Sequence, residues 1–237
     1  MPCDSKVEAA RGAMELLRRL GVSGVAGLGS GSTLLEFLRL FSGELRELFD
    51  LVVPSSIETG LEAASLGLVV GDPRVYRGVD VYIDGADEVQ PKTGNMVKGG
   101  GGALLGEKML CRSSKLNIFI VGEEKLVDSL GSRTPIPLEV EPGYLAMALE
   151  SLEALGLNPR VRTSGGKRGP VVSDWGGVIV DLHVGPLEDP GRLESLLRSA
   201  PGVRESGLFL GLADYVVVGL RSCGHLVLGP YRREARD

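Results

Sequence analysis

Residues that could do chemistry are concentrated in one stretch of the chain, residues 79–110. The stretch contains carboxylates, a lysine and a run of glycines: Asp84, Asp87, Glu88, Lys98, Gly99, Gly100, Gly101, Gly102 and Glu107. Moving a proton next to a carbonyl needs a carboxylate base close to the carbon, and a cation or donor close to the oxygen that gains charge. Glu107 and Lys98 are the candidate pair for this chemistry, and either Asp84 or Asp87 could serve as a second acid or base.

The glycine run could bind an anion. Because glycine has no side chain, the backbone N–H groups of such a run can approach a ligand closely. The segment ALLGEKML that follows has helical spacing, so the positive end of its helix dipole would point at the same anion. A flexible connecting loop is the alternative for glycines alone, but the flanking Lys98, Glu107 and aspartates favour a site.

A second glycine-rich segment, GLGSGST at 27–33, offers hydroxyl groups and amides in front of a predicted helix. Ser30, Gly31, Ser32 and Thr33 could hold a phosphate or sugar hydroxyls, with a helix cap at Ser32 or Thr33 as the plain alternative. The spacing does not match a dinucleotide fingerprint, and the lysine of a P-loop is absent. Lys125 follows a predicted buried strand and could also meet a phosphate, although lysines there are often only solvated.

The acids of the 79–110 stretch could in principle bind Mg²⁺. Against a metal, Lys98 is a competing cation, and neither His183 nor His225 has the spacing of a metal ligand. We therefore predict no metal site.

The elements that must position these residues alternate between strands and helices. Apolar runs predict strands, and helical spacing predicts helices between them; the strands are expected at 25–28, 51–53, 68–70, 79–83 and 116–121. This alternation predicts an α/β fold with a doubly wound parallel sheet. Asp84 and Asp87 follow strand 79–83 directly, and open α/β sheets bind ligands at the carboxyl ends of their strands.

From about residue 135 the order of the elements changes to βαββαβ, with the last of these strands at 207–209. This order predicts a smaller α+β domain of split-βαβ, ferredoxin-like type. Residues 213–218 predict a further buried strand that returns to the first domain. The expected domains are therefore 1–131 with 206–237, and 132–205.

The whole-chain properties restrict the function classes. With 237 residues, 43% of them hydrophobic, the chain can bury a sizeable core. A net charge of -5 offers no general attraction to nucleic acid. Cys3, Cys111 and Cys223 are odd in number and far apart, which favours reduced thiols over a disulfide framework. Without a signal peptide or a long apolar segment, we expect a cytoplasmic protein with neither membrane nor nucleic-acid partners.

Together these motifs resemble ribose-5-phosphate isomerase of the A type. The similarity runs in family order through GLGSGST, SSIETG, YIDGADEV, MVKGGGGALLGEKM, EEKLVDSLG, PIPLEVEP and PGVRESGLFLG. It implies a Rossmann-like domain with a smaller lid domain, no cofactor, and interconversion of D-ribose 5-phosphate and D-ribulose 5-phosphate through an enediol. A homodimer or homotetramer is the family-level expectation.

The resemblance also implies roles for single residues. Glu107 would be the acid/base that moves the proton between C1 and C2. The implied substrate contacts are Ser30, Gly31, Ser32, Thr33, Asp84, Gly85, Ala86, Asp87, Lys98, Gly99, Gly100, Gly101 and Lys125. Two positions are less regular: Gly106 stands where the family commonly has a larger residue, and Lys6 lies near a family phosphate contact without aligning securely.

Three other function classes compete with this interpretation. A sugar-phosphate-sensing regulator would need a DNA-binding module, which the first forty or so residues do not offer. A nicotinamide-dependent oxidoreductase would need a ribose-binding acid at the end of the second strand, whereas Asp50 precedes that strand. A coenzyme A transferase would use a nucleophilic glutamate, so turnover of ribose 5-phosphate without a cofactor distinguishes all four classes.

Overall fold

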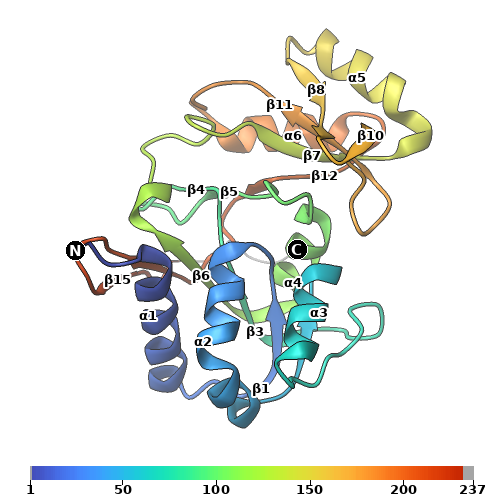
Figure 1. Cartoon of the computed structure of the whole chain (residues 1–237). Helices are drawn as coiled ribbons and strands as arrows, with labels where there is room; N and C mark the ends of the chain where they lie inside the picture. The colour runs from blue at the N-terminus through green and yellow to red at the C-terminus, as the bar shows by residue number, and fades with distance from the viewer. Residues whose placement is uncertain (1, 232–237) are drawn as a thin grey trace.

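Alternating strands and helices build a six-stranded sheet in the computed structural model, which describes residues 2–231 (Figure 1). Its strand order is β15–β14–β6–β3–β1–β2, and every pair is parallel except β14 with β15. The strands are β1 (Gly24–Leu28), β2 (Phe49–Pro54), β3 (Val79–Asp84), β6 (Ser114–Gly122), β14 (Tyr215–Gly219) and β15 (His225–Leu228). The predicted α/β class with a mostly parallel sheet is confirmed, and the antiparallel edge strand β15 is an addition to it.

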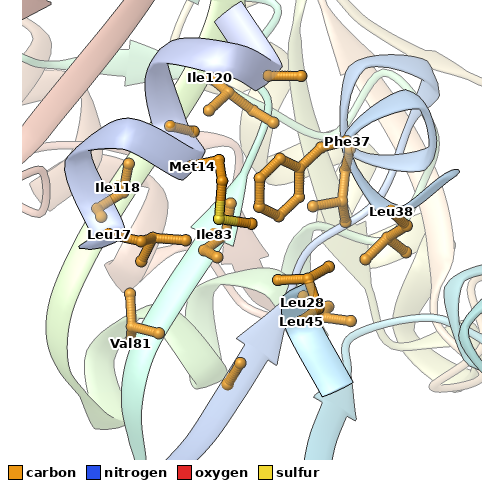
Figure 2. Close-up of a cluster of buried hydrophobic side chains, with 14 of the residues drawn as sticks. Met14, Leu17, Leu28, Phe37, Leu38, Leu45, Val81, Ile83, Ile118 and Ile120 are labelled. Atoms are coloured by element: carbon orange, nitrogen blue, oxygen red, sulfur yellow. The ribbon is translucent and has the colours of Figure 1, made fainter. Parts of the chain in front are cut away.

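Helices cover both faces of this sheet. Helices α1 (Ser5–Leu20) and α2 (Ser32–Leu48) pack on one face, α4 (Leu104–Ser113) packs on the other, and α3 (Ile57–Ser65) lies beside β2. Figure 2 shows the apolar core between α1, α2 and the strands, formed by Met14, Leu17, Leu28, Phe37, Leu38, Leu45, Val81, Ile83, Ile118 and Ile120. Within the described part of the chain, none of the helices has the length and apolar character needed to cross a membrane.

A smaller unit with its own sheet lies over the carboxyl ends of the parallel strands (Figure 1). Its chain order is β7 (Ile136–Val140), α5 (Leu145–Ala154), β8 (Pro159–Val161), β11 (Val178–Leu182), α6 (Pro190–Ser199) and β12 (Val203–Ser206). The sheet order β12–β7–β11–β8 is antiparallel throughout, as a split-βαβ arrangement requires. A short hairpin of β9 (Thr163–Ser164) and β10 (Lys167–Pro170) is inserted between β8 and β11.

Two predicted strands were wrong. The fourth strand of the small sheet is β12, whereas residues 208–209, predicted for that place, form β13 (Leu208–Phe209). Strand β13 pairs with β5 (Met96–Val97), which pairs with β4 (Glu88–Val89) in a separate three-stranded sheet. Residues 68–70 form only an isolated parallel bridge beside β2, Val52 with Val70, so β2 is the edge strand of the large sheet.

Buried ionic and polar contacts join the two units. Glu88, fully buried, accepts backbone N–H bonds from Gly131, Arg133 and Thr134, which lie in the segment between the large sheet and β7. Lys108 on α4 is also fully buried, with its Nζ 2.7 Å from Oε1 of Glu205 on β12. The predicted domain boundaries at 131/132 and 205/206 remain predictions; they fall in the first of these connections and within β12.

The prediction of reduced thiols was wrong for two of the three cysteines. Cys3 and Cys223 form a disulfide that links the start of the chain to the turn between β14 and β15. The two residues are 220 positions apart, and closing so long a loop in the unfolded chain is worth about 5 kcal/mol in the chain-entropy account. The long separation in the sequence gave no sign of this pair. The two cysteines meet because α1 packs beside β14 and brings the chain ends together. Cys111 lies outside this disulfide and is buried in the core, so for this residue the prediction of a reduced thiol is confirmed.

Candidate active site

The predicted site residues surround one small cavity, of about 110 Å³, at the carboxyl ends of β1 and β3. Its lining is Ser30, Gly31, Ser32, Thr33, Gly85, Ala86, Asp87, Lys98, Gly99, Gly100, Gly101, Glu107 and Lys125. Of the residues predicted from the sequence, Asp84 alone is missing from this lining. It is fully buried directly behind the cavity wall, so of the two aspartates only Asp87 faces the cavity.

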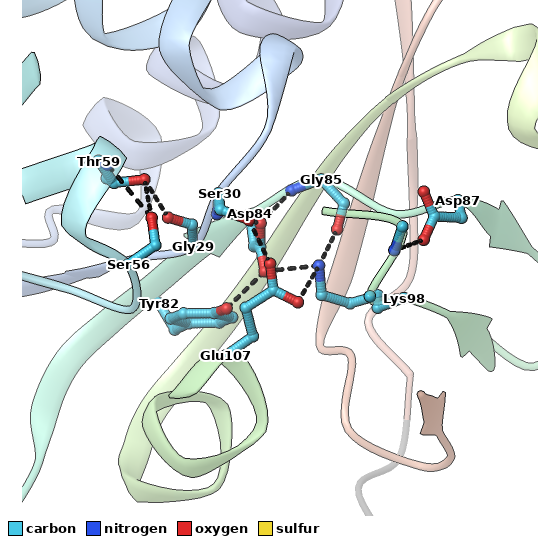
Figure 3. A network of polar contacts seen from close by, with 12 residues as sticks. Gly29, Ser30, Ser56, Thr59, Tyr82, Asp84, Gly85, Asp87, Lys98 and Glu107 are labelled. Atoms are coloured by element: carbon cyan, nitrogen blue, oxygen red, sulfur yellow. Dashed lines mark hydrogen bonds and ion pairs between the residues drawn. The ribbon is translucent and has the colours of Figure 1, made fainter. Parts of the chain in front are cut away.

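Lys98 forms the centre of the polar network (Figure 3). It follows β5, is 3% exposed, and places its Nζ 2.6 Å from Oδ2 of Asp84 and 3.2 Å from Oε2 of Glu107. The same ammonium donates a hydrogen bond of 2.7 Å to the carbonyl of Gly85. Burial lowers the pKa of Lys98, but the charges of Asp84 and Glu107 outweigh that effect and hold its pKa above the ordinary value. Lys98 is therefore a fixed cation.

Asp84 is the anchor of this cation. Its Oδ1 accepts backbone N–H bonds from Ser30 and Gly85, and its Oδ2 accepts from the hydroxyl of Tyr82 besides contacting Lys98. Gly29 allows this approach, since a Cβ there would lie 1.8 Å from the carboxyl carbon of Asp84. Burial and the neighbouring charges raise the pKa of Tyr82 well above its ordinary value, so the phenol stays a neutral donor. Both carboxylate oxygens of Asp84 are thus occupied by contacts within the protein.

Tyr82 was not among the predicted site residues, although the sequence contains a signal for it. Residues two apart on a strand point to the same face, so Tyr82 and Asp84 on β3 must be neighbours. The hydrogen bond between Ser30 and Glu107 had no such local signal, because the two residues are 77 positions apart.

Glu107 enters the cavity from the first turn of α4. The hydroxyl of Ser30 donates a hydrogen bond of 2.6 Å to Oε1 of Glu107, while Oε2 faces Lys98 and accepts no hydrogen bond from the described residues. Burial, together with the charge of Asp84, raises the pKa of Glu107 to about 7, against the opposing effect of Lys98. A carboxylate with a pKa near neutrality can both take and return a proton at working pH. Glu107 therefore has the position and the proton affinity of a general acid/base.

Asp87 differs from Asp84 in its surroundings. Its Oδ2 accepts the backbone N–H of Gly100 at 2.8 Å, and the side chain remains partly exposed at the cavity. Gly99, with φ +103°, starts the turn that brings this amide back toward Asp87. Asp87 is therefore the carboxylate that can still accept hydrogen bonds from a ligand.

The opposite part of the cavity has the character of an anion site. Helix α2 begins there with Gly31 as its N-cap and without a side-chain cap bond, which corrects the predicted capping role of Ser32 or Thr33. The amides of its first turn are thus left for another partner. Lys125 lines the same cavity, and Nζ of Lys6 lies 2.9 Å from Oγ of Ser32.

The acids of the 79–110 stretch do not form a metal centre. Lys98 occupies the position beside Asp84 that a cation would take, and Glu88 is directed to the linker amides. Among residues 2–231 there is no group of three or more His, Cys, Asp or Glu side chains arranged to hold a metal ion.

A larger cavity, of about 610 Å³, lies beside α3 and holds none of the predicted residues. Trp175, at the tip of the hairpin before β11, forms part of its wall and lies against Gly106, where an added Cβ would be 2.4 Å from the indole nitrogen. This contact explains why Gly106 is small: a side chain there would displace the hairpin. The lining is mostly apolar, and Arg74 is paired with Asp72, so the proton chemistry belongs to the smaller cavity.

Comparison with known proteins agrees with this geometry. The family model described as ribose 5-phosphate isomerase A (phosphoriboisomerase A) matches residues 51–222. The ribose-5-phosphate isomerase A of Aeropyrum pernix is 68% identical over 98% of both chains, and that of Methanothermobacter thermautotrophicus is 42% identical over 82% of this chain and 86% of its own.

Solved structures give the same result. The ribose 5-phosphate isomerase A of Methanocaldococcus jannaschii superposes with a TM-score of 0.86 at 34% identity, covering 94% of this chain and 97% of its own. A D-ribose-5-phosphate isomerase in complex with phospho-erythronic acid superposes with the same TM-score at 33% identity, covering 96% of this chain and 100% of its own.

Proposed function

The chain belongs to the ribose 5-phosphate isomerase A family, and we propose that Glu107 is the acid/base with which it interconverts D-ribose 5-phosphate and D-ribulose 5-phosphate. The reaction is an aldose–ketose isomerisation that needs a proton moved between C1 and C2 and no redox carrier. The observation that carries the assignment is the buried Glu107, with its raised pKa, held between Ser30 and Lys98 at one cavity.

Ring opening precedes the proton transfer, because ribose 5-phosphate is mostly a closed furanose. Of the two aspartates, Asp87 is the candidate to exchange protons with the ring oxygen and the anomeric hydroxyl, since it faces the cavity and accepts only one hydrogen bond there from the described residues. Asp84 is buried and already engaged with Lys98, Tyr82 and two amides.

The ring-opening role can be tested apart from the proton transfer. Ribulose 5-phosphate has its phosphate on O5 and cannot close to a furanose, so its C1 protons exchange with solvent through the enediol alone. In Asp87→Asn we expect conversion to ribose 5-phosphate to fall while deuterium uptake at C1 from D₂O persists. Equal losses in both measurements would move Asp87 into the proton transfer itself.

Glu107 then takes the C2 proton of the open-chain aldose and returns it to C1, while the proton of the O2 hydroxyl passes to O1. As the proton leaves, negative charge grows on the carbonyl oxygen, and a cation at that oxygen lowers the barrier. Lys98 directs its ammonium to Asp84, Glu107 and the carbonyl of Gly85 in the resting site. When Glu107 becomes neutral by accepting the proton, its hold on Lys98 weakens, and one N–H becomes available to the enediolate at that step.

The phosphate end of the substrate is assigned to the first turn of α2 and to Lys125. Uncapped helix N–H groups and a lysine are a suitable set for a phosphate. Holding the far end of the sugar fixes the reacting carbons against Glu107, which lowers the entropic part of the barrier.

The deciding experiment is an assay of the purified protein on ribose 5-phosphate without added cofactor, following ribulose 5-phosphate. A nicotinamide enzyme, a coenzyme A transferase and a ligand-binding regulator all predict no turnover under these conditions. Absence of turnover in folded protein would therefore contradict the proposal.

We further propose a homodimer or homotetramer and a cytoplasmic location. Exposed apolar side chains such as Ile57, Leu61 and Met147 favour self-association. Light scattering coupled to gel filtration measures the molecular mass directly.

A sugar phosphate substrate is charged and stays where it is made, which supports the proposed cytoplasmic location. Fractionation of cells, with an antibody to the chain, tests this location.

A further inference from the structure

Arg162, between β8 and β9 of the small unit, reaches across to the glycine loop of the active site. Its Nη1 donates hydrogen bonds of 2.9 Å to the carbonyls of both Gly99 and Gly100. Its Nε and Nη2 form a two-point pair with Asp181 on β11, at 2.8 and 2.5 Å. Four of the five donors of the guanidinium are thus assigned, two to the loop and two to the carboxylate.

Both residues of this pair sit on rigid supports. The backbone N–H of Arg162 bonds to the carbonyl of Ile179, and its own carbonyl accepts from Val171. Asp181 is paired across the sheet with Pro137 and Arg160. The side chains of Arg162 and Asp181 are 17% and 15% exposed, so water competes little for the two bonds between them.

The planarity of the peptide bond converts this contact into an orientation of the cavity amides. In a trans peptide the C=O and the following N–H point in opposite directions. Holding the carbonyl of Gly99 therefore turns the N–H of Gly100 away from Arg162, and that N–H is the one bonded to Asp87. By the same argument, holding the carbonyl of Gly100 turns the N–H of Gly101 away from Arg162, in a residue that lines the cavity.

We infer that Arg162 is a positioning residue for the isomerisation, holding the Gly99 and Gly100 carbonyls so that the next two amides face Asp87 and the substrate. The inference rests on the proposed function of the cavity. Within the loop the Gly99 carbonyl also accepts the N–H of Gly102. Glycine peptides nevertheless flip easily because both peptide neighbours lack side chains, so a loop of this composition is steadied by an external support. Arg162, oriented by Asp181, supplies that support from the small unit.

The test compares Arg162→Met with Arg168→Met, a matched control that removes an exposed arginine from β10 of the same unit. For Arg162→Met we expect kcat to fall on the order of 10²-fold with little change in KM, the size of effect that a misplaced site produces. Hydrogen exchange of the 98–104 peptide should become faster at the same time. The control should match the wild type in both measurements.

Two further variants test the same role if Arg162→Met folds poorly. In Arg162→Lys a point charge cannot serve two carbonyls and a carboxylate together, so we expect kcat to stay at least about tenfold below wild type. Asp181→Asn keeps the shape and loosens the arginine, and should lower kcat in the same direction.

The possible outcomes separate this inference from the proposed function. Inactivity of the wild-type protein on ribose 5-phosphate would overturn the proposed function. An active wild type with Arg162→Met unchanged in kcat, or with full activity restored by lysine, would overturn the positioning role. A lower unfolding temperature with unchanged kcat per folded molecule would reduce Arg162 to a purely structural contact.

Discussion

The carboxylate of Glu107 lies 3.2 Å from the ammonium of Lys98, and both side chains are almost completely buried. An ordinary surface pair at this distance would leave the glutamate a weak base, with a pKa near its value in water. Here burial and the second carboxylate, Asp84, raise the proton affinity of Glu107 against the effect of the lysine.

Replacing Glu107 by Gln keeps the shape of the side chain and removes the base. We expect kcat to fall by roughly 10²–10⁴-fold, the usual range for losing one general base, while ribose 5-phosphate still binds. Steady-state assays and calorimetric titration of the variant measure the two effects separately. Near-wild-type turnover in folded Glu107→Gln would remove this residue from the mechanism.

The pKa of Glu107 also makes stability depend on pH in a defined direction. Its pKa rises from 4.5 to about 7 on folding, so between these values the folded state binds more protons than the unfolded state. Stability from this group is therefore present at low pH and lost as pH rises through the window, by roughly 3 kcal/mol in total.

The measurement is denaturant unfolding of wild type and Glu107→Gln at pH 5 and pH 8, because the difference between the two proteins isolates this group. We expect the wild type to lose stability relative to the variant at the higher pH. A difference that is the same at both pH values would contradict the raised pKa. In the wild type, kcat/KM should fall as pH is lowered below about 7, since the base form of Glu107 is then depleted.

The two lysines of the cavity should have opposite kinetic effects. Lys125→Ala is expected to raise KM about 10- to 100-fold with a smaller change in kcat, because Lys125 is assigned to the phosphate, remote from the reacting carbons. Lys98→Met should instead lower kcat, at a cost on the order of 3 kcal/mol, as for loss of one oxyanion donor. If Lys98→Met raised KM alone, the two assignments would have to be exchanged.

Lys98→Met should also destabilise the fold, unlike Lys125→Ala. Removing the ammonium leaves Asp84 and Glu107 buried without a cation, a change that typically costs about 3–5 kcal/mol. Urea unfolding of both variants provides the comparison, with the partly exposed Lys125 as the control.

Activity should survive exhaustive chelation, because Lys98 occupies the position that a metal would take beside Asp84. The assay compares protein dialysed against EDTA with untreated protein. Loss of activity that Mg²⁺ or Mn²⁺ specifically restores would contradict this prediction and show that the acids of the 79–110 stretch bind a catalytic metal ion.

Local patterns in the sequence predicted most of the fold and most of the cavity lining. Apolar runs and helical spacing identified the strands and helices because each reflects burial of a neighbouring face. GLGSGST and DGADE each follow a parallel strand, and the carboxyl ends of such strands meet at one edge. The convergence of Ser30 and Asp87 followed from that geometry.

The remaining features depend on contacts between distant parts of the chain. The positioning contact of Arg162 with Gly99 crosses 63 residues. The pairing of β12 with β7 places the mostly polar residues 203–206 in the small sheet, where the apolar run at 207–209 was predicted. The burial of Asp84 depends on Gly29, which gives no sign by itself of what approaches it. Such features can be recognised only from the three-dimensional arrangement of the strands.

The disulfide between Cys3 and Cys223 makes everything between these residues a closed covalent ring. A protease cut within a ring does not release a piece. The exposed turn at Gly165 and Gly166, between β9 and β10, is a suitable place for such a cut. One fragment would then carry Glu107 and the other β14, which pairs with β6 inside the same sheet. The nicked protein should therefore keep its mass on a denaturing gel until a reductant is added, and only then separate into two bands.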